Sequence, residues 1–146
     1  MRAVRSVAVV ALVAVLAGCA QEQQERYCDA VEANQARLGE IVSEGRWDAM
    51  IQARPVFEDL AGEAPADIRD EWRTVLEAVR GFEEAVTAAD VDLSDYDPGD
   101  PPEAVTEEEQ AAIERAVQQL VSPDTAEALG SLEQQARDVC QTPLEM

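Results

Sequence analysis

Carboxylates are almost the only side chains in this sequence that could carry acid–base or metal chemistry. The 146 residues include 31 aspartates and glutamates and 11 arginines, but no histidine and no lysine. This excludes histidine-based triads, imidazole metal ligands, Schiff-base lysines and the phosphate-binding lysine of a P-loop. Paired carboxylates could support glycoside hydrolysis, but two residues each of Trp, Tyr and Phe hardly suffice for a sugar-binding groove. We therefore predict a non-enzymatic protein without a cofactor.

The densest group of possible metal ligands is an aspartate-rich stretch that begins at Asp90. Calcium takes six to eight oxygen ligands, and an EF-hand loop also needs Gly at position 6 and Glu at position 12. When Asp90 is position 1, Asp92 and Ser94 fall at positions 3 and 5, but Asp95 stands at 6 and Pro101 at 12. The stretch therefore does not fit an EF-hand.

Its composition instead predicts an exposed acidic crossover over residues 90–105, since prolines and aspartates end helices and favour loops. A looser site for calcium or another divalent cation is the alternative function of this segment. Its candidate ligands are Asp90, Asp92, Asp95 and Asp97.

The first 18 residues have the order of a bacterial export signal. Arg2 and Arg5 precede an eleven-residue apolar run from Val7 to Ala17, and no acidic residue occurs before Glu22. Eleven residues are too few to span a bilayer as a helix. The run ends in Leu16-Ala17-Gly18-Cys19, which resembles the lipobox of bacterial lipoproteins.

That resemblance implies a location. In such lipoproteins the cysteine of the box receives a diacylglyceryl group, the preceding peptide is removed, and the cysteine becomes the N-terminus; here that residue is Cys19. The protein is then expected on the extracytoplasmic face of the cell membrane, held by acyl chains. Residues 20–26 are polar and predict a short tether. An ordinary secretory signal with a chance cysteine is the alternative.

Without residues 1–18 the chain has nine arginines against 31 acidic residues, a net charge of −22. Such a surface repels nucleic acid and anionic lipid. It favours a basic protein or a cell-envelope partner if the charges are clustered, whereas a uniformly acidic surface would serve only solubility. The expected contact surfaces are Asp70, Glu71, Glu77 and Glu84 on the central helix and the turn Glu107 to Glu109.

Two cysteines remain once Cys19 is acylated, and outside the cytoplasm an even number indicates a disulfide. A bond between Cys28 and Cys140 closes nearly the whole domain, and a loop that long is worth about 4.7 kcal/mol in the chain-entropy model. The alternative is a two-thiolate metal site, for which the chain offers neither a histidine nor a third free cysteine.

Hydrophobic periodicity predicts an all-α fold, a small disulfide-closed bundle of about four main helices over residues 27–140. The central helix, from about 65 to 89, carries a stripe at spacings of three and four. Its members are Ile68, Trp72, Val75, Val79, Phe82 and Val86. A first helix is expected over 27–44, with a stripe of Tyr27, Val31, Leu38, Ile41 and Val42, and with Gly45 at its end.

Shorter elements are expected around this frame. A second helix should stop before Pro55, because proline disfavours helical geometry in the preceding residue, and a further turn should end at Gly62. Thr106 and Glu109 form a capping box, and Ser122-Pro123 stops that helix and starts the last one, with a bend in place of a hairpin. Residues 141–146 are expected to be a loose tail.

The apolar faces expected on these last two helices are Ile113, Ala116, Val117, Leu120 and Val121, and then Leu129, Leu132, Ala136 and Val139. The bond between Cys28 and Cys140 needs the two chain ends to meet, which an even number of long antiparallel helices allows.

Taken whole, the chain resembles small two-cysteine helical lipoproteins of high-GC Gram-positive bacteria. The resemblance implies a location and an architecture, and it transfers no functional residue. Besides the lipobox, it is carried by Tyr27-Cys28, Ala64-Pro65, Asp95-Tyr96-Asp97-Pro98 and Asp138-Val139-Cys140.

Overall fold

The computed structural model describes residues 4–46, 48–93 and 102–144, with side chains from residue 21 onward. Over these ranges the chain is all-α and contains no strand, which confirms the predicted fold class. The elements are α1 (Val4–Ser43), α2 (Ala49–Glu63), the 3₁₀ turn η1 (Ala66–Ile68), α3 (Arg69–Ala88), α4 (Glu107–Leu120), α5 (Pro123–Gln135) and the π-helical turn η2 (Ala136–Cys140).

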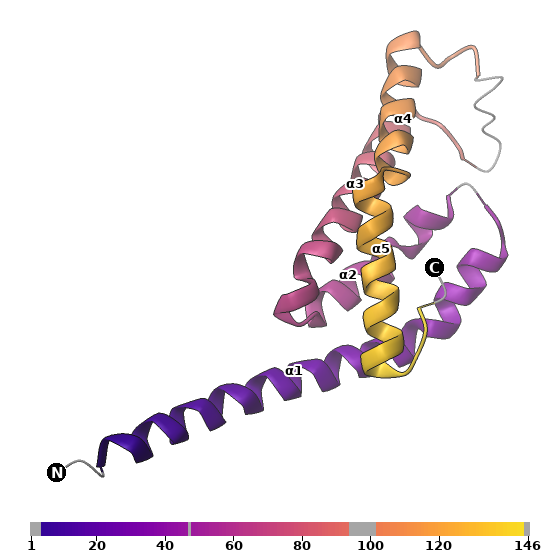
Figure 1. The fold of residues 1–146 in the computed structure, drawn as a ribbon. Coiled ribbons are helices and arrows are strands. Elements are labelled where there is room, and N and C mark those ends of the chain that lie inside the picture. The colour runs from indigo at the N-terminus through magenta and orange to yellow at the C-terminus, as the bar shows by residue number, and fades with distance from the viewer. Residues whose placement is uncertain (1–3, 47, 94–101, 145–146) are drawn as a thin grey trace.

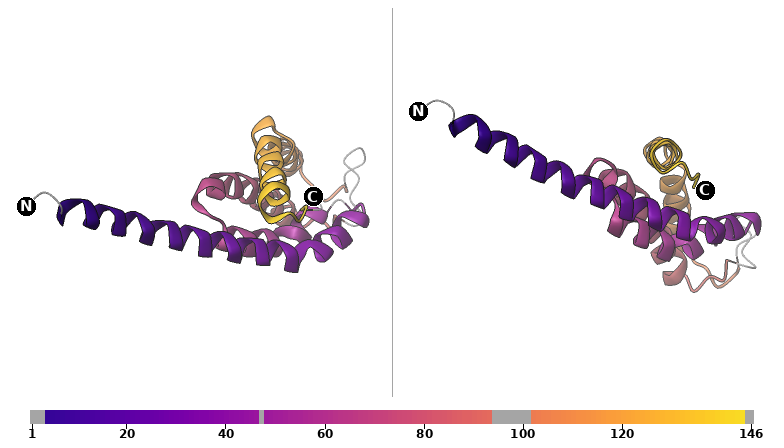
Figure 2. Two further views of the ribbon diagram at one scale, coloured as in Figure 1. Left: turned by 60° about the horizontal axis from the view of Figure 1, so that its bottom comes forward. Right: turned by 90° about the horizontal axis from the view of Figure 1, so that it is seen from below.

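Helix α3 lies at the centre of the bundle. It packs against α2 on one side and against both α4 and α5 on another, while α1 packs against α2 and meets η2 at the disulfide. α4 and α5 follow one another around a bend and together form the fourth long element (Figure 1). The N-terminal half of α1 projects clear of the other helices in every view (Figures 1 and 2).

The predicted stripe of α3 forms the core. All of its members are at most 5% exposed. Trp72 contacts two neighbouring helices: its Nε1 donates a hydrogen bond to the Tyr27 hydroxyl at 3.2 Å, and its ring lies 5.7 Å from that of Phe57. Burial of each such large side chain is worth about 1.5–3 kcal/mol. The start of the helix differs from the prediction, because Pro65 is extended and η1 precedes the α-helical turns.

The predicted break at Pro55 is wrong. α2 is one helix of fifteen residues with Pro55 inside it. Proline removes one intrahelical hydrogen bond and crowds the preceding turn, at a cost of about 3 kcal/mol. Here the ring faces solvent, while burial of the opposite face outweighs that cost. The buried residues of that face are Ala53, Val56, Phe57 and Leu60.

The predicted helix boundary at residue 27 is also absent, because α1 runs without interruption through residues 20–26. Its C-terminal end agrees better with the sequence, since Gly45 adopts a φ of +60° just after the helix. Val42 is an exception in the predicted stripe and is exposed.

The C-terminal elements confirm both predicted caps. Thr106 and Glu109 form a reciprocal capping box, and the Ser122 side chain accepts a hydrogen bond from the Thr125 amide. The expected apolar faces are only partly correct, since Val117, Val121 and Val139 are exposed. The tail was expected to be loose, yet Leu144 is 4% exposed and packs into the main core.

Candidate functional site

The Cys28–Cys140 disulfide predicted from the cysteine count is confirmed. It joins α1 to η2, two segments 112 residues apart, with the Cα atoms 5.0 Å from each other. The side chain of Cys19, the predicted acylation site, lies outside the described residues. Among the described residues, no helix is long and apolar enough to cross a membrane.

Polar residues of the predicted tether surround this disulfide. The Gln24 amide donates to Cys28 Sγ at 3.3 Å and to Cys140 Sγ at 3.9 Å, and it accepts a hydrogen bond from Gln135 Nε2 at 3.2 Å. The adjacent residue, Gln23, donates a hydrogen bond from Nε2 to the Ala64 carbonyl at 3.1 Å. Residues 23 and 24 are therefore packed parts of the domain.

The structure places only half of the proposed metal ligands. Asp90 and Asp92 lie just after α3, and Asp90 adopts a φ of +51°. Ser94, Asp95 and Asp97 lie outside the described residues. Within the described ranges, no three Asp, Glu, Cys or His side chains are grouped so that they could hold a metal ion.

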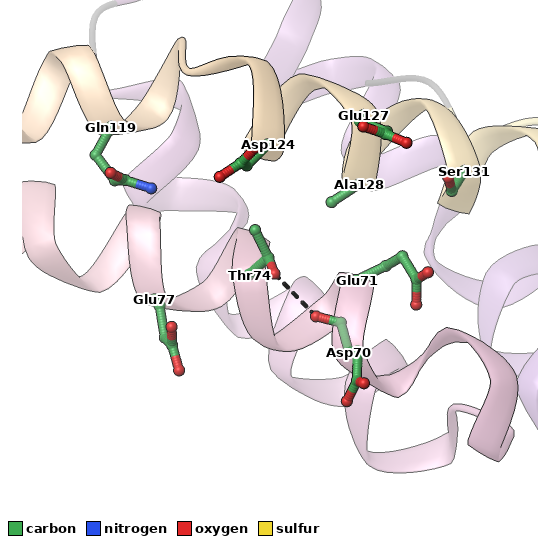
Figure 3. Close-up of a pocket in the computed structure, with 9 residues that line it drawn as sticks. All are labelled: Asp70, Glu71, Thr74, Glu77, Gln119, Asp124, Glu127, Ala128 and Ser131. Carbon is green, nitrogen blue, oxygen red and sulfur yellow. Dashed lines mark hydrogen bonds between the residues drawn. The ribbon is translucent and has the colours of Figure 1, made fainter.

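The acidic residues of α3 instead line an open groove of about 460 Å³ between α3 and α5, here called the acidic groove. Three of the four predicted α3 residues, Asp70, Glu71 and Glu77, belong to it, whereas Glu84 does not. Its complete lining is Asp70, Glu71, Thr74, Glu77, Gln119, Asp124, Glu127, Ala128 and Ser131 (Figure 3).

The acidic groove contains five carboxylates and no cationic side chain. Figure 3 shows that the Glu71 side chain extends along the space between the helices, while Asp70 and Glu77 point away from α5. Glu71 Oε2 is buried and has no hydrogen-bond partner. An uncompensated carboxylate in partly dehydrated surroundings attracts a donor or a cation more strongly than one in free solution.

The two carboxylates contributed by α5, Asp124 and Glu127, are not predicted from the sequence. Both are exposed, and their spacing alone gives no functional signal. They could have been found only from the knowledge that α5 packs beside α3. The bend at Ser122-Pro123 starts α5, so it determines the position of Asp124 and Glu127 relative to α3.

The predicted acidic turn before α4 is less available than the sequence suggests. Glu109 Oε2 accepts hydrogen bonds from the backbone N and from Oγ1 of Thr106, both at 2.8 Å. These bonds hold the pKa of Glu109 below its ordinary value. Glu107 and Glu108 remain exposed, so the turn offers two carboxylates to a partner and uses the third as a cap.

The opposite edge of α3 has a different charge pattern. Arg54 Nε of α2 lies 2.7 Å from Glu83 Oε2, and Arg80 Nη2 of α3 lies 3.0 Å from Glu58 Oε1. Hydrogen bonds from Arg80 and Arg54 lower the pKa of Glu58. Carboxylates on the α2 side are thus paired with arginines across the helix–helix contact. Beside the acidic groove, Arg73 pairs with Asp70 at 2.9 Å and with Glu77 at 3.9 Å, all within α3, and no ion pair crosses to α5 in the described residues.

No protein-family model, curated protein or solved structure matches this chain.

Proposed function

We propose that the chain is an extracytoplasmic lipoprotein, acylated on Cys19, whose helical bundle is a non-catalytic interaction module for a basic partner. The observation that carries the proposal is the acidic groove, where Arg73 pairs with only two of the five carboxylates, Asp70 and Glu77. Glu71, Asp124 and Glu127 make no ion pair within the described residues, and Glu71 Oε2 is buried without a hydrogen-bond partner. A protein or cell-envelope component that presents arginine, lysine or amino groups would supply the missing donors.

The composition supports this choice over an enzyme. Catalysis would need groups of perturbed acidity around a substrate pocket, and the chain has neither histidine nor lysine to provide them. The acidic groove is open and polar, which suits a side chain of a docked partner better than an enclosed small molecule.

The partner can be sought by photo-crosslinking in living cells from a probe at Ser131, beside the acidic groove, followed by mass spectrometry. We expect a basic partner whose yield falls several-fold when Glu71→Gln, Asp124→Asn and Glu127→Gln are combined. A matched control is the triple change Asp29→Asn, Glu32→Gln and Glu40→Gln, which removes the same charge from exposed positions of α1. Equal yields from both triple variants would overturn the groove assignment.

The anchor is tested separately. Wild-type protein should sediment with membranes and carry an acyl mass on Cys19, while Cys19→Ser should leave the membrane fraction. Two or three acyl chains give stable attachment, whereas one gives only marginal binding. Recovery of unmodified wild-type protein from the culture medium would contradict the lipoprotein assignment.

A further inference from the structure

We infer that the turn between α2 and α3 faces the lipid head groups of the membrane, with the C-terminal end of α3 directed away from it. The inference rests on the proposed acylation of Cys19. It concerns the orientation of the domain relative to the bilayer, which a tether of seven flexible residues would leave undetermined.

The first argument is the short distance between anchor and domain. Gln23, four residues after Cys19, donates a hydrogen bond to the Ala64 carbonyl in the α2–α3 turn at 3.1 Å. Arg26 pairs with Glu63 of the same turn at 3.2 Å. Because a helix rises about 1.5 Å per residue, Gln23 lies only about 6 Å along α1 from the acylated position.

The second argument is the continuity of α1. The helix runs unbroken from before Cys19 to Ser43, and Gln24 ties it to both sulfurs of the disulfide. A continuous helix fixed at its middle transmits its direction to the bundle. Only residues 20–22 remain between the anchor and the first contacts, too few for the domain to turn freely.

The third argument is the arrangement of the other helices. The bilayer cannot cut through the bundle, so it must lie on the side toward which the N-terminal half of α1 projects (Figures 1 and 2). The α2–α3 turn is on that side. From this turn, the twenty residues of α3 run away from the anchor for about 30 Å and end at the crossover.

The charges of the turn are mixed, so its position follows from the short connection and not from net attraction. Glu63 is neutralised by Arg26, and Asp67 is exposed. Arg69 is exposed as well; its Nε donates to the same Ala64 carbonyl at 3.3 Å, and it makes no ion pair within the described residues. Its remaining N–H groups suit a lipid phosphate.

The test uses the acylated full-length mature protein in vesicles of phosphatidylcholine and phosphatidylglycerol that contain a nickel-chelating lipid. Because Cys19 is acylated and the other two cysteines are bonded, Asp67→Cys or Glu107→Cys supplies a single free thiol for a nitroxide. Both positions are exposed. We expect nickel to relax the label at 67 several-fold more than the label at 107. Equal relaxation at the two positions would overturn the inference.

Two variants keep the acylated Cys19 and change the contacts that orient the domain on the membrane. A flexible Gly-Ser insertion between Ala20 and Gln21 should bring the two labels to similar relaxation; an unchanged difference would contradict the role of helix continuity. Arg69→Gln should weaken relaxation at 67, whereas Arg115→Gln, an exposed change on α4, should not. An equal effect of both would exclude the Arg69–phosphate contact. Absence of an acyl mass would instead refute the lipoprotein assignment, so the two failures are distinguishable.

Discussion

The two edges of α3 differ in how their charges are compensated. Toward α2, Arg54 and Arg80 pair with Glu83 and Glu58 across the helix–helix contact. Toward α5, five carboxylates line the acidic groove, and no ion pair joins the two helices within the described residues. Both edges cover the same buried stripe of α3. Arginines thus link α3 to α2, whereas on the other edge Arg73 pairs only within α3, with Asp70 and Glu77.

This difference indicates that the α3–α5 contact is held by apolar packing and by the disulfide, without an ion pair between the two helices in the described residues. Thr125, Ala128 and Leu132 are the buried residues of α5, and the π-helical turn that follows ends at the Cys28–Cys140 bond. Like charges a few ångströms apart cost little when fully hydrated, and more where water is partly excluded. Three groove carboxylates, Glu71, Asp124 and Glu127, make no ion pair within the described residues, which is consistent with a contact surface.

The largest expected effect is loss of the covalent link that supports the α5 edge. Changing Cys28 and Cys140 together to Ser should lower the free energy of unfolding by about 2–5 kcal/mol, because the unfolded chain regains the freedom of a long loop. Urea unfolding of oxidised, reduced and double-serine protein measures it. Equal stability of oxidised and reduced protein would show that packing alone holds α5.

Removal of buried apolar volume at the same edge should rank next. Leu132→Ala is expected to cost about 2–5 kcal/mol, since the side chain is fully buried and leaves a cavity. Val121→Ala is the control, because Val121 is 73% exposed and should change stability by less than about 0.5 kcal/mol. Similar losses in both variants would contradict the packing of α5 against the core.

Local sequence signals predict many of the helix boundaries. They fail where contacts between residues distant in sequence determine the local structure. The caps at Thr106 and Ser122 involve residues three apart, so the sequence contains the whole motif. The local rule predicts a helix end at Pro55, because it cannot weigh the burial of Phe57 and Leu60 against one lost hydrogen bond. The sequence around Leu144 predicts a loose tail, since nothing near that residue in sequence indicates the core that covers it.

The acidic groove likewise combines residues that local sequence predicts with residues that only the fold brings together. The sequence predicts the α3 half of the acidic groove, because Asp70 and Glu77 lie on the helix face opposite the apolar stripe and Glu71 lies at the edge of that stripe. The α5 half is not predicted, since it depends on the bend that brings α5 beside α3. Residues 20–26 resemble a tether in sequence for a similar reason: Gln23 and Gln24 bond to partners 41 and 116 residues away.

Removing one carboxylate from each edge of α3 should change the melting temperature by smaller amounts and in opposite directions. Glu58→Gln removes the carboxylate shared by Arg54 and Arg80 and should lower the melting temperature, by less than Leu132→Ala. Glu71→Gln relieves repulsion and removes an unpaired charge, so the melting temperature should rise slightly. A fall in both variants, measured by calorimetry at low ionic strength, would show that Glu71 has a structural partner.

The α2 edge also predicts a pH dependence. The arginines lower the pKa of Glu58 below its ordinary value of 4.5 in the folded state. A depressed pKa means that the unfolded chain binds the proton more readily, so this contribution is complete above pH 4.5 and is lost as the pH falls through the folded pKa. The stability of Glu58→Gln should therefore approach that of the wild type under acidic conditions. A constant difference from pH 7 to pH 3 would contradict the pairing.

The smallest expected effect concerns divalent cations. Calcium and magnesium should raise the melting temperature by the same small amount, because both screen a domain of net charge −22. A calcium site at Asp90, Asp92, Asp95 and Asp97 would instead give a larger shift with calcium than with magnesium, reversed by chelator, since a ligand that binds only the folded state stabilises it. The variant Asp90→Asn with Asp92→Asn removes two of these ligands and leaves the acidic groove intact. If it abolished a calcium-selective shift, the crossover would be the functional site, and the acidic groove would be only part of the solvated surface.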